Sequence, residues 1–292
     1  MYDCIIVGAG TAGLTAAIYL RRASKKVLVL EAKSYGGQIV NALKIENYPG
    51  EPNISGFEFA EKIYNQSLDL GTEILFEKVI NIENNFDYKE VITSKNRYKC
   101  KAIILATGSD NRKLELENED NLIGKGISYC ATCDGNFYKD KIVAVIGGGK
   151  TAIEDALYLS DIASKVYLIH RRDLDKIDKE NIETISNSNI VKINGDNKLG
   201  SIDIKNKDGK ITNIKIDGLF IAIGRIPENQ NFAKLINLDE KGYIISNEEC
   251  NTNVPGIFVA GDARTKKVRQ LVTAAGDGAI AATEVLKYIK AL

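Results

Sequence analysis

Two cysteines and an aspartate within one short stretch, Cys130-Ala131-Thr132-Cys133-Asp134, are the residues best suited to chemistry. Two thiols at this spacing can close a small disulfide or supply half of a zinc site. Zinc needs two further ligands at similar spacing, and the other three cysteines are isolated, so we expect no metal site. Asp134 is a candidate proton donor and acceptor for a thiolate, or a helix N-cap.

Two glycine-rich stretches occupy equivalent places in a repeated pattern. Each follows a short apolar run typical of a buried parallel strand, residues 4–7 and 142–146, and precedes a helical stretch. In each copy a second apolar run leads to the residue 23 positions after the first glycine, Glu31 or His170. One copy alone is a weak signal, whereas two copies in the same register predict two dinucleotide-binding units. The cysteine pair stands beside both copies, which favours a redox role.

The first copy predicts a site for FAD or NAD. Gly8 suits the tight turn, Gly10 leaves room for a pyrophosphate, and Gly13 lets the helix pack closely on the strand. Glu31 can accept hydrogen bonds from ribose hydroxyls and would repel a 2′-phosphate. The plainer alternative is a sheet turn without a ligand, with Glu31 solvated.

The second copy favours NADPH over NADH. Ala152 replaces the third glycine, and His170-Arg171-Arg172 stands where the first copy has its acidic residue. Two guanidinium groups suit a 2′-phosphate. A solvated strand end is the alternative for the arginines. His170 is the only histidine, so a metal site or a serine–histidine pair would have to use it, and we expect neither.

The remaining pattern predicts an α/β protein with two Rossmann-like dinucleotide-binding domains, three-layer ββα or doubly wound, the second inserted into the first. Late strands at 102–105 and 219–221 each precede a crossing to the other domain. We expect domain boundaries at 1–111, 112–227 and 228–292, a final strand near 256–262 and a closing helix over 276–289. The Asn-rich segments 81–88 and 187–197 are expected to be loops.

Composition excludes several classes of protein. The 292 residues include 39 basic and 39 acidic side chains, so no net charge favours nucleic acid or an anionic membrane as a partner. Residues 4–20 carry no charge, but Arg21 and Arg22 follow them, whereas a signal peptide has its charge in front. Five cysteines are too few for a secreted disulfide scaffold. We expect a cytoplasmic protein without a membrane segment.

The chain resembles the low-molecular-weight thioredoxin reductases over essentially its full length. The most specific match is CATCDG at 130–135 between the two glycine motifs. The other matching pieces are GAGTAG at 8–13, GGQ at 36–38, ENYPG at 46–50, ATG at 106–108, GGGKTA at 147–152, HRR at 170–172, GIFVAGDA at 256–263 and RQ at 269–270.

The resemblance implies residue roles. For FAD it implies Gly8, Gly10, Thr11, Ala12, Gly13, Glu31, Ala32, Gly36, Gly37, Gln38, Ile39, Asn47, Ala106, Thr107, Gly108, Gly261, Asp262, Ala263, Arg269, Gln270 and Leu271. For NADPH it implies Gly147, Gly149, Lys150, Thr151, Ala152, His170, Arg171, Arg172, Lys176, Ile223, Gly224 and Arg225. Many relatives have a further arginine after His-Arg-Arg. Here Lys176 would substitute, and Asp173 and Asp175 nearby weaken the phosphate pocket.

The implied activity is an NADPH-dependent thioredoxin-disulfide reductase acting as a homodimer. Electrons pass from NADPH through FAD to the Cys130–Cys133 pair and then to thioredoxin. Cys133 would face the flavin, Cys130 would attack the thioredoxin disulfide, and Asp134 would be the acid–base residue. The alternatives are a reductase of the same fold fed by ferredoxin or NADH, and a flavin redox sensor without turnover.

Overall fold

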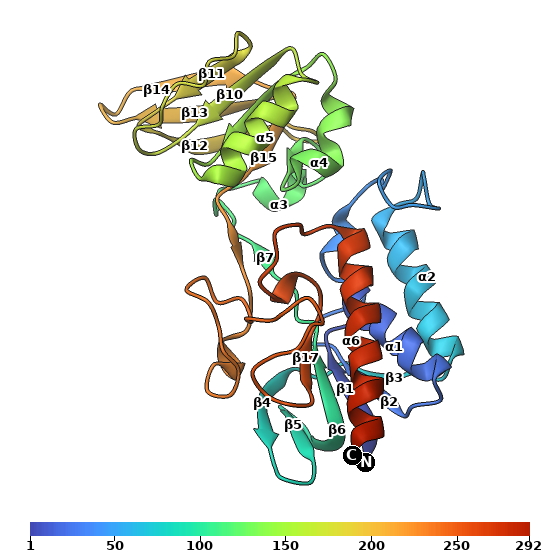
Figure 1. The fold of residues 1–292 in the computed structure, drawn as a ribbon. Helices are drawn as coiled ribbons and strands as arrows, with labels where there is room; N and C mark the ends of the chain where they lie inside the picture. The colour runs from blue at the N-terminus through green and yellow to red at the C-terminus, as the bar shows by residue number, and fades with distance from the viewer. The chain divides into compact units, whose positions relative to one another are not determined.

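The structure, a computed structural model, describes residues 1–292 and consists of two compact units (Figure 1). The first unit contains Met1–Asp110 and Ile226–Leu292, and the second contains Asn111–Arg225, inserted into it. The chain passes between them at β7 (Asp110–Asn111) and β16 (Arg225–Ile226), which pair as a two-stranded sheet. The sequence predicts that the first domain ends at residue 111 and resumes at residue 228. In the structure the first unit ends at Asp110 and resumes at Ile226.

The first unit is built on a seven-stranded sheet. Its parallel strands are β3 (Glu73–Leu75), β2 (Val27–Leu30), β1 (Tyr2–Val7), β6 (Arg97–Leu105) and β17 (Ile257–Val259). The antiparallel strands β5 (Lys89–Thr93) and β4 (Val79–Asn84) continue it beyond the first half of β6. The carboxyl ends of β1 and β6 therefore lie side by side, with Val7 paired to Leu105.

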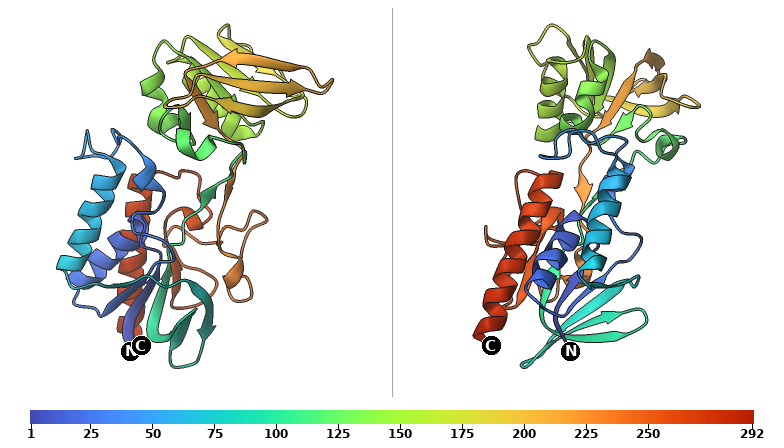
Figure 2. Two further views of the ribbon diagram at one scale, coloured as in Figure 1. Left: turned by 180° about the vertical axis from the view of Figure 1, so that it is seen from behind. Right: turned by 90° about the vertical axis from the view of Figure 1, so that its right-hand side faces the viewer.

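Helices cover one face of this sheet. The helices α1 (Thr11–Arg22), α2 (Gly56–Asp69) and α6 (Leu271–Ala291) pack together (Figures 1 and 2). Alternate strand residues, such as Ile6 and Ile104, pack in the core on the helix side, while Ile5 and Ile103 pack on the other side against the 232–263 segment. This alternation follows from the two-residue period of a strand. The unit has three layers.

The second unit has the same three-layer construction. Its parallel sheet has the order β11 (Ile182–Ile185), β10 (Lys165–Ile169), β9 (Ile142–Ile146), β15 (Gly218–Ile221) and β8 (Ile127–Ser128). Helix α5 (Lys150–Ser160) and the short α4 (Ala131–Asp134) lie on one face. The antiparallel strands β12 (Ser188–Asn194), β13 (Ser201–Asn206) and β14 (Ile211–Lys215) cover the other (Figure 2). The prediction of two Rossmann-like domains, one inserted, is confirmed.

The two loop predictions are wrong in part. Residues 81–84 belong to β4, and residues 188–194 form β12. In both strands apolar residues face a core, Val79 and Ile82 in β4 and Ile190 and Ile193 in β12. Burial and ladder hydrogen bonds outweigh the turn preference of asparagine.

The closing helix begins earlier than predicted. α6 starts at Leu271, because Gln270 and Thr273 cap its first turn, and it continues through Gly276 and Gly278. The uncharged stretch 4–20 is divided between β1, a glycine turn and α1. No helix combines the length and apolar character needed to span a bilayer.

Candidate functional site

In the first glycine turn, Gly8 and Gly13 leave no space for a side chain, whereas a Cβ on Gly10 would meet only the Gly36 carbonyl oxygen, at 4.0 Å. Gly8 has φ of +110°, and a Cβ there would collide with the carbonyl oxygen of Ala106 at the end of β6. A Cβ on Gly13 would collide with the carbonyl oxygen of Gly8. Gly10 caps α1 without any side-chain hydrogen bond, so the first N–H groups of the helix remain available to an anion.

Glu31 lies beside this turn because it directly follows β2. Its carboxylate accepts hydrogen bonds from the backbone N–H groups of Ala9 and Lys33, both at 2.8 Å. Gly36 donates its N–H to the Ala9 carbonyl at 2.8 Å, which brings the 32–39 segment to the turn. Gln38 donates to Asp110 at 2.7 Å. A carboxylate fixed at this place is suited to ribose hydroxyls.

The C-terminal part of the first unit reaches the same turn. A Cβ on Gly261 would lie 2.9 Å from the Cβ of Ala12. The Asn47 side-chain amide donates to Gln270 Oε1 at 3.3 Å, where α6 begins. The Arg269 guanidinium lies 4.1 Å from the ring centroid of Tyr243. The structure therefore brings the early and late halves of the predicted flavin set together.

The other predicted flavin residues lie in the same segments. Thr11 and Ala12 are in the first turn of α1, and Ala32 follows Glu31. Gly37 and Ile39 are in the 3-10 helix η1 (Gly37–Asn41), Thr107 and Gly108 follow β6, Asp262 and Ala263 are in η4 (Gly261–Ala263), and Leu271 opens α6.

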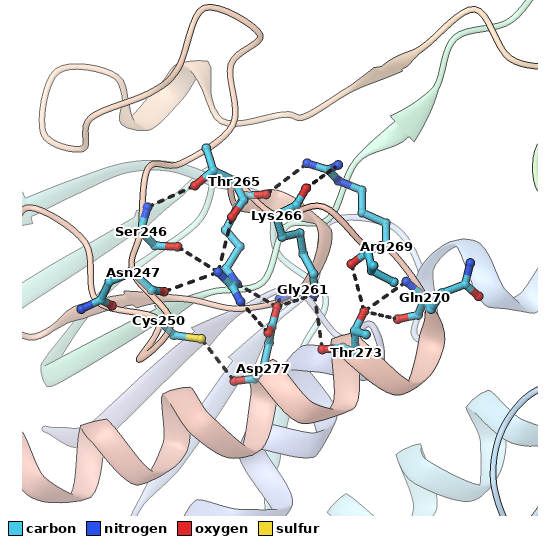
Figure 3. Close-up of polar contacts among 12 residues, drawn as sticks. Ser246, Asn247, Cys250, Gly261, Thr265, Lys266, Arg269, Gln270, Thr273 and Asp277 are labelled. Atoms are coloured by element: carbon cyan, nitrogen blue, oxygen red, sulfur yellow. Dashed lines mark hydrogen bonds and ion pairs between the residues drawn. The ribbon is translucent and has the colours of Figure 1, made fainter. Parts of the chain in front are cut away.

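A buried charge cluster supports the segment that carries Gly261 and Arg269 (Figure 3). The Asp277 carboxylate, on α6, accepts hydrogen bonds from Arg264 Nε at 2.9 Å, Lys266 Nζ at 2.7 Å and the Gly261 N–H at 3.0 Å. These side chains are less than one tenth exposed. Burial raises the pKa of Asp277, but the hydrogen bonds from Arg264 and Lys266 outweigh it and hold the pKa below the ordinary carboxyl value.

Asn229 joins the chain segments on either side of the insertion. It is fully buried and accepts a hydrogen bond from the Thr107 hydroxyl at 2.8 Å. Its amide donates to the carbonyl oxygens of Gly242 and Ala263, both at 3.0 Å.

The second glycine turn has the same construction. Gly147 has φ of +150°, and a Cβ there would lie 2.8 Å from the Cβ of Ala152. Gly149 caps α5 without a side-chain hydrogen bond, and nothing lies within 4 Å of a Cβ built on it. Lys150 and Thr151 form the first turn of α5. This turn also has space for an anion at a helix N-terminus.

The basic residues after β10 lie in three different environments in the structure. Burial and the charges of Arg171 and Arg172 lower the pKa of His170, whose ring lies against Gly148. Both arginines are exposed and form no ion pair. Lys176 instead lines a separate pocket of about 830 Å³, with neighbours that include Leu174, Lys179 and Thr184. Ile223 and Gly224 follow β15, and Arg225 begins β16.

The cysteine pair lies at the start of α4. Cys130 and Cys133 form a disulfide with a Cα–Cα separation of 5.3 Å. Cys133 is exposed and Cys130 is partly buried. The N–H groups of Cys133 and Asp134 point to the Cys130 carbonyl at 3.3 and 3.1 Å, which closes this single helical turn. The remaining cysteines, Cys4, Cys100 and Cys250, are free and buried, and burial raises the pKa of each thiol.

Asp134 is the titratable group of this turn. Burial raises its pKa, and the hydroxyl of Ser128, which donates to Oδ2 at 2.6 Å, lowers it in part. The net pKa is above the ordinary carboxyl value, so Asp134 takes up a proton more readily than an exposed aspartate. Asp134 is the last residue of α4, whose N-cap is Cys130, and it occupies the N-cap position of the following 3-10 helix η2 (Gly135–Tyr138). Its side chain makes no capping hydrogen bond there, because it bonds to Ser128 instead.

The residues present fit the two dinucleotides expected from the sequence. Two glycine turns offer backbone N–H groups to a pyrophosphate, because each lies at a helix N-terminus without a side-chain capping hydrogen bond. The first glycine of each turn has no space for a Cβ. Glu31 beside the first turn suits a ribose, and the unpaired arginines beside the second suit a phosphate.

Sequence reasoning missed three residues at these sites: Ser128, Asn229 and Asp277. Their roles depend on contacts with residues 6, 122 and 13 positions away in the chain. The only signal was an isolated charge in the otherwise apolar and small-residue stretch 274–282.

Comparison with known proteins gives matches over the full chain. A family model described as pyridine nucleotide-disulphide oxidoreductase matches residues 2–278. The thioredoxin reductase of Listeria monocytogenes is 41% identical over 100% of this chain and 95% of its own length, and that of Bacillus subtilis is 39% identical over 100% and 96%. A solved thioredoxin reductase structure from Streptococcus pyogenes superposes with a TM-score of 0.96 at 39% identity, covering 100% of this chain and 99% of that one.

Proposed function

The chain belongs to the pyridine nucleotide-disulphide oxidoreductases, and within this family we propose that it is a thioredoxin reductase that uses FAD and NADPH. The observation that carries the proposal is the Cys130–Cys133 disulfide, partly exposed and followed at once by a carboxyl with a raised pKa. It lies in the same unit as the second glycine turn.

We assign the cofactors to separate units. The first glycine turn, Glu31 and the 261–271 segment would hold FAD, and the second turn with Arg171 and Arg172 would hold NADPH. When bound, these groups supply the two electrons that open the Cys130–Cys133 disulfide. The Arg171 and Arg172 guanidinium groups would bind a 2′-phosphate, which distinguishes NADPH from NADH.

The reduced cysteine pair then exchanges with the disulfide of thioredoxin. The Cys130 thiolate attacks one thioredoxin sulfur, so that a mixed disulfide forms, the thioredoxin S–S bond breaks, and Asp134 delivers a proton to the released thiolate. The Cys133 thiolate next attacks Cys130 Sγ and releases the second thioredoxin sulfur as a thiolate, which takes a proton from solvent. The Cys130–Cys133 pair is thereby oxidised to a disulfide, and thioredoxin is reduced to a dithiol.

Donor and acceptor selectivity tests the proposal. The purified flavoprotein is mixed anaerobically with NADPH, NADH or reduced ferredoxin, with and without oxidised thioredoxin. We expect rapid flavin bleaching with NADPH and catalytic appearance of thioredoxin thiols. Bleaching without any thioredoxin reduction would leave the sensor alternative, and bleaching only by ferredoxin or NADH would leave a reductase with a different donor.

We also propose a homodimer, as the resemblance implies, and a cytoplasmic location, as expected from the sequence. Size-exclusion chromatography with light scattering should give twice the mass of one chain. A monomeric mass at micromolar concentration would contradict the dimer. Fractionation of source cells should recover the protein with other cytoplasmic enzymes.

A further inference from the structure

The Ser128 hydroxyl connects Asp134 to the backbone of Cys130. It donates to Asp134 Oδ2 at 2.6 Å and accepts a hydrogen bond from the Cys130 N–H at 3.0 Å. The Cys130 carbonyl oxygen lies 3.3 Å from the same hydroxyl. One hydroxyl therefore touches both the carboxyl and the peptide group of the first redox cysteine.

The position of Ser128 is fixed by the sheet. It is the last residue of β8, pairs with Phe220 of β15, and is only 5% exposed. Asp134, by contrast, is placed by one turn of helix. The hydroxyl thus connects a short helical turn to a buried strand within one unit of the chain.

The hydroxyl has one hydrogen to give. When Asp134 is ionised, the shorter distance directs that hydrogen to Asp134. When Asp134 is protonated, its own O–H can donate to Ser128 Oγ, which frees the serine hydrogen for the Cys130 carbonyl. The hydrogen-bond direction around Cys130 therefore depends on the protonation state of Asp134.

We propose that Ser128 is a positioning residue that acts through Asp134, holding its carboxyl next to the cysteine pair and favouring the ionised form. The inference rests on the proposed function only where it assigns Asp134 to proton transfer during disulfide exchange. Through this hydrogen bond Ser128 lowers the pH at which Asp134 gains and loses its proton, against the larger effect of burial.

No charged side chain competes with Ser128 for this role. Helix α5 and the 3-10 helix η2 (Gly135–Tyr138) pack on α4. They face this turn with Tyr158 and Tyr138, and burial followed by the charges of Asp134 and Asp217 raises the pKa of Tyr138 to about 12. Lys141 lies over the Tyr138 ring, 5.6 Å from its centroid. Burial raises the pKa of Asp134, and the hydrogen bond from Ser128 lowers it.

The test measures the pKa of Asp134 directly in the oxidised full-length protein. Aspartate labelled with ¹³C at the carboxyl carbon gives a pH-dependent NMR signal, which Asp134→Asn identifies by its loss. We expect Ser128→Ala to raise the pKa by about one unit, since a hydrogen bond to a charged group is lost. Ser164→Ala is the matched control, because its hydroxyl contacts the Lys141 carbonyl and no carboxylate.

A second pair of variants covers a failure of Ser128→Ala to fold. Ser128→Thr and Ser128→Val have the same shape and differ by the hydroxyl, so only Ser128→Val should raise the pKa of Asp134. Equal pKa values in the two variants, or a wild-type value in Ser128→Ala, would overturn the proposal.

The pH profile of thioredoxin reduction provides the functional readout. The limb that disappears in Asp134→Asn should move to higher pH by about one unit in Ser128→Ala, with Ser128→Thr close to wild type. A loss of rate without movement of the limb would mean a structural role only. If the NMR shift is found but thioredoxin is never reduced, the proposed function fails and the Ser128–Asp134 coupling stands.

Discussion

At the scale of single residues, cationic side chains occur in two opposite environments, exposed without an ion pair and buried within one. Arg171 and Arg172 are exposed and form no ion pair, whereas Arg264 and Lys266 are buried against Asp277. Unpaired surface guanidinium groups are available to a ligand. Buried cations need their carboxylate, because removal of one partner leaves an uncompensated charge in a region of low dielectric.

Removal of both arginines should weaken the binding of NADPH and leave the binding of NADH unchanged. In Arg171→Ala/Arg172→Ala two charge-assisted contacts to a 2′-phosphate are lost, about 2–4 kcal/mol, or roughly 30- to 700-fold in affinity. We expect the KM for NADPH to rise accordingly and that for NADH to stay unchanged. Lys207→Ala/Lys210→Ala, two exposed lysines of the same unit, is the control. Equal losses for both cofactors would refute the 2′-phosphate assignment.

Neutralisation of Asp277 should destabilise the protein and weaken the binding of FAD. Asp277→Asn leaves Arg264 and Lys266 buried without a counter-ion, at a cost of about 3–5 kcal/mol in the free energy of unfolding. The control on the same helix is Glu284→Gln, whose partner Lys287 is exposed, with less than about 1 kcal/mol expected. Urea unfolding and the fraction of FAD retained after gel filtration measure both effects.

The same carboxylate predicts a pH dependence of stability. The folded pKa of Asp277 is lowered, so its contribution is fully present above the unfolded carboxyl value, about 3.9, and is lost as the pH falls through the folded pKa. Unfolding free energies measured from pH 7 down to the acid limit should fall less steeply in Asp277→Asn. An identical acid slope in both proteins would contradict the assigned ion pair.

At the scale of elements, glycines determine how closely the end of β1 and helix α6 can pack against α1. Gly13 lets the first turn of α1 rest on the Gly8 carbonyl, and Gly278 lets α6 rest on the Ala12 carbonyl. The start of α1 is therefore held between β1 and α6 with backbone atoms on both sides. This close packing explains the glycine at position 278 within α6, whereas Gly276, where the sequence predicts the helix to begin, has no such contact.

Substitution by alanine at two glycines of α6 should have different effects on the free energy of unfolding. A Cβ on Gly278 would collide with the Ala12 carbonyl, so Gly278→Ala should lower the free energy of unfolding by about 1–3 kcal/mol. Nothing lies within 4 Å of a Cβ on Gly276, and alanine favours a helix, so Gly276→Ala should be neutral or stabilising by up to about 1 kcal/mol. Urea denaturation compares them, and a similar loss in both would disprove the packing argument.

At the scale of the whole molecule, the first unit is assembled from segments on both sides of the inserted unit. The Thr107 hydroxyl, the buried Asn229 amide and the Ala263 carbonyl connect the chain before the insertion to the chain after it. Gly261 against Ala12 and Gln270 against Asn47 add two further links. The predicted flavin residues, scattered from Gly8 to Leu271, thus belong to one unit.

Local spacing made part of this organisation predictable. Strand, glycine turn and helix are contiguous in each copy, so the repeat was visible without any knowledge of distant contacts. The sequence did not predict strands β4 and β12. Burial of Ile82 and Ile193 against residues distant in the chain, and not local residue preference, determines that these segments form strands. Ser128 and Asp277 were missed for the same reason, since their partners are set by tertiary packing.

Thioredoxin reduction by single cysteine variants tests whether electrons pass through the Cys130–Cys133 pair. Turnover with NADPH is measured for wild type, Cys130→Ser, Cys133→Ser and Cys100→Ser, each with equal bound flavin. We expect a loss of at least about 10³-fold in the first two variants, with NADPH still bleaching the flavin, and near wild-type turnover in Cys100→Ser. Wild-type turnover in either Cys130→Ser or Cys133→Ser would refute the transfer of electrons through this cysteine pair.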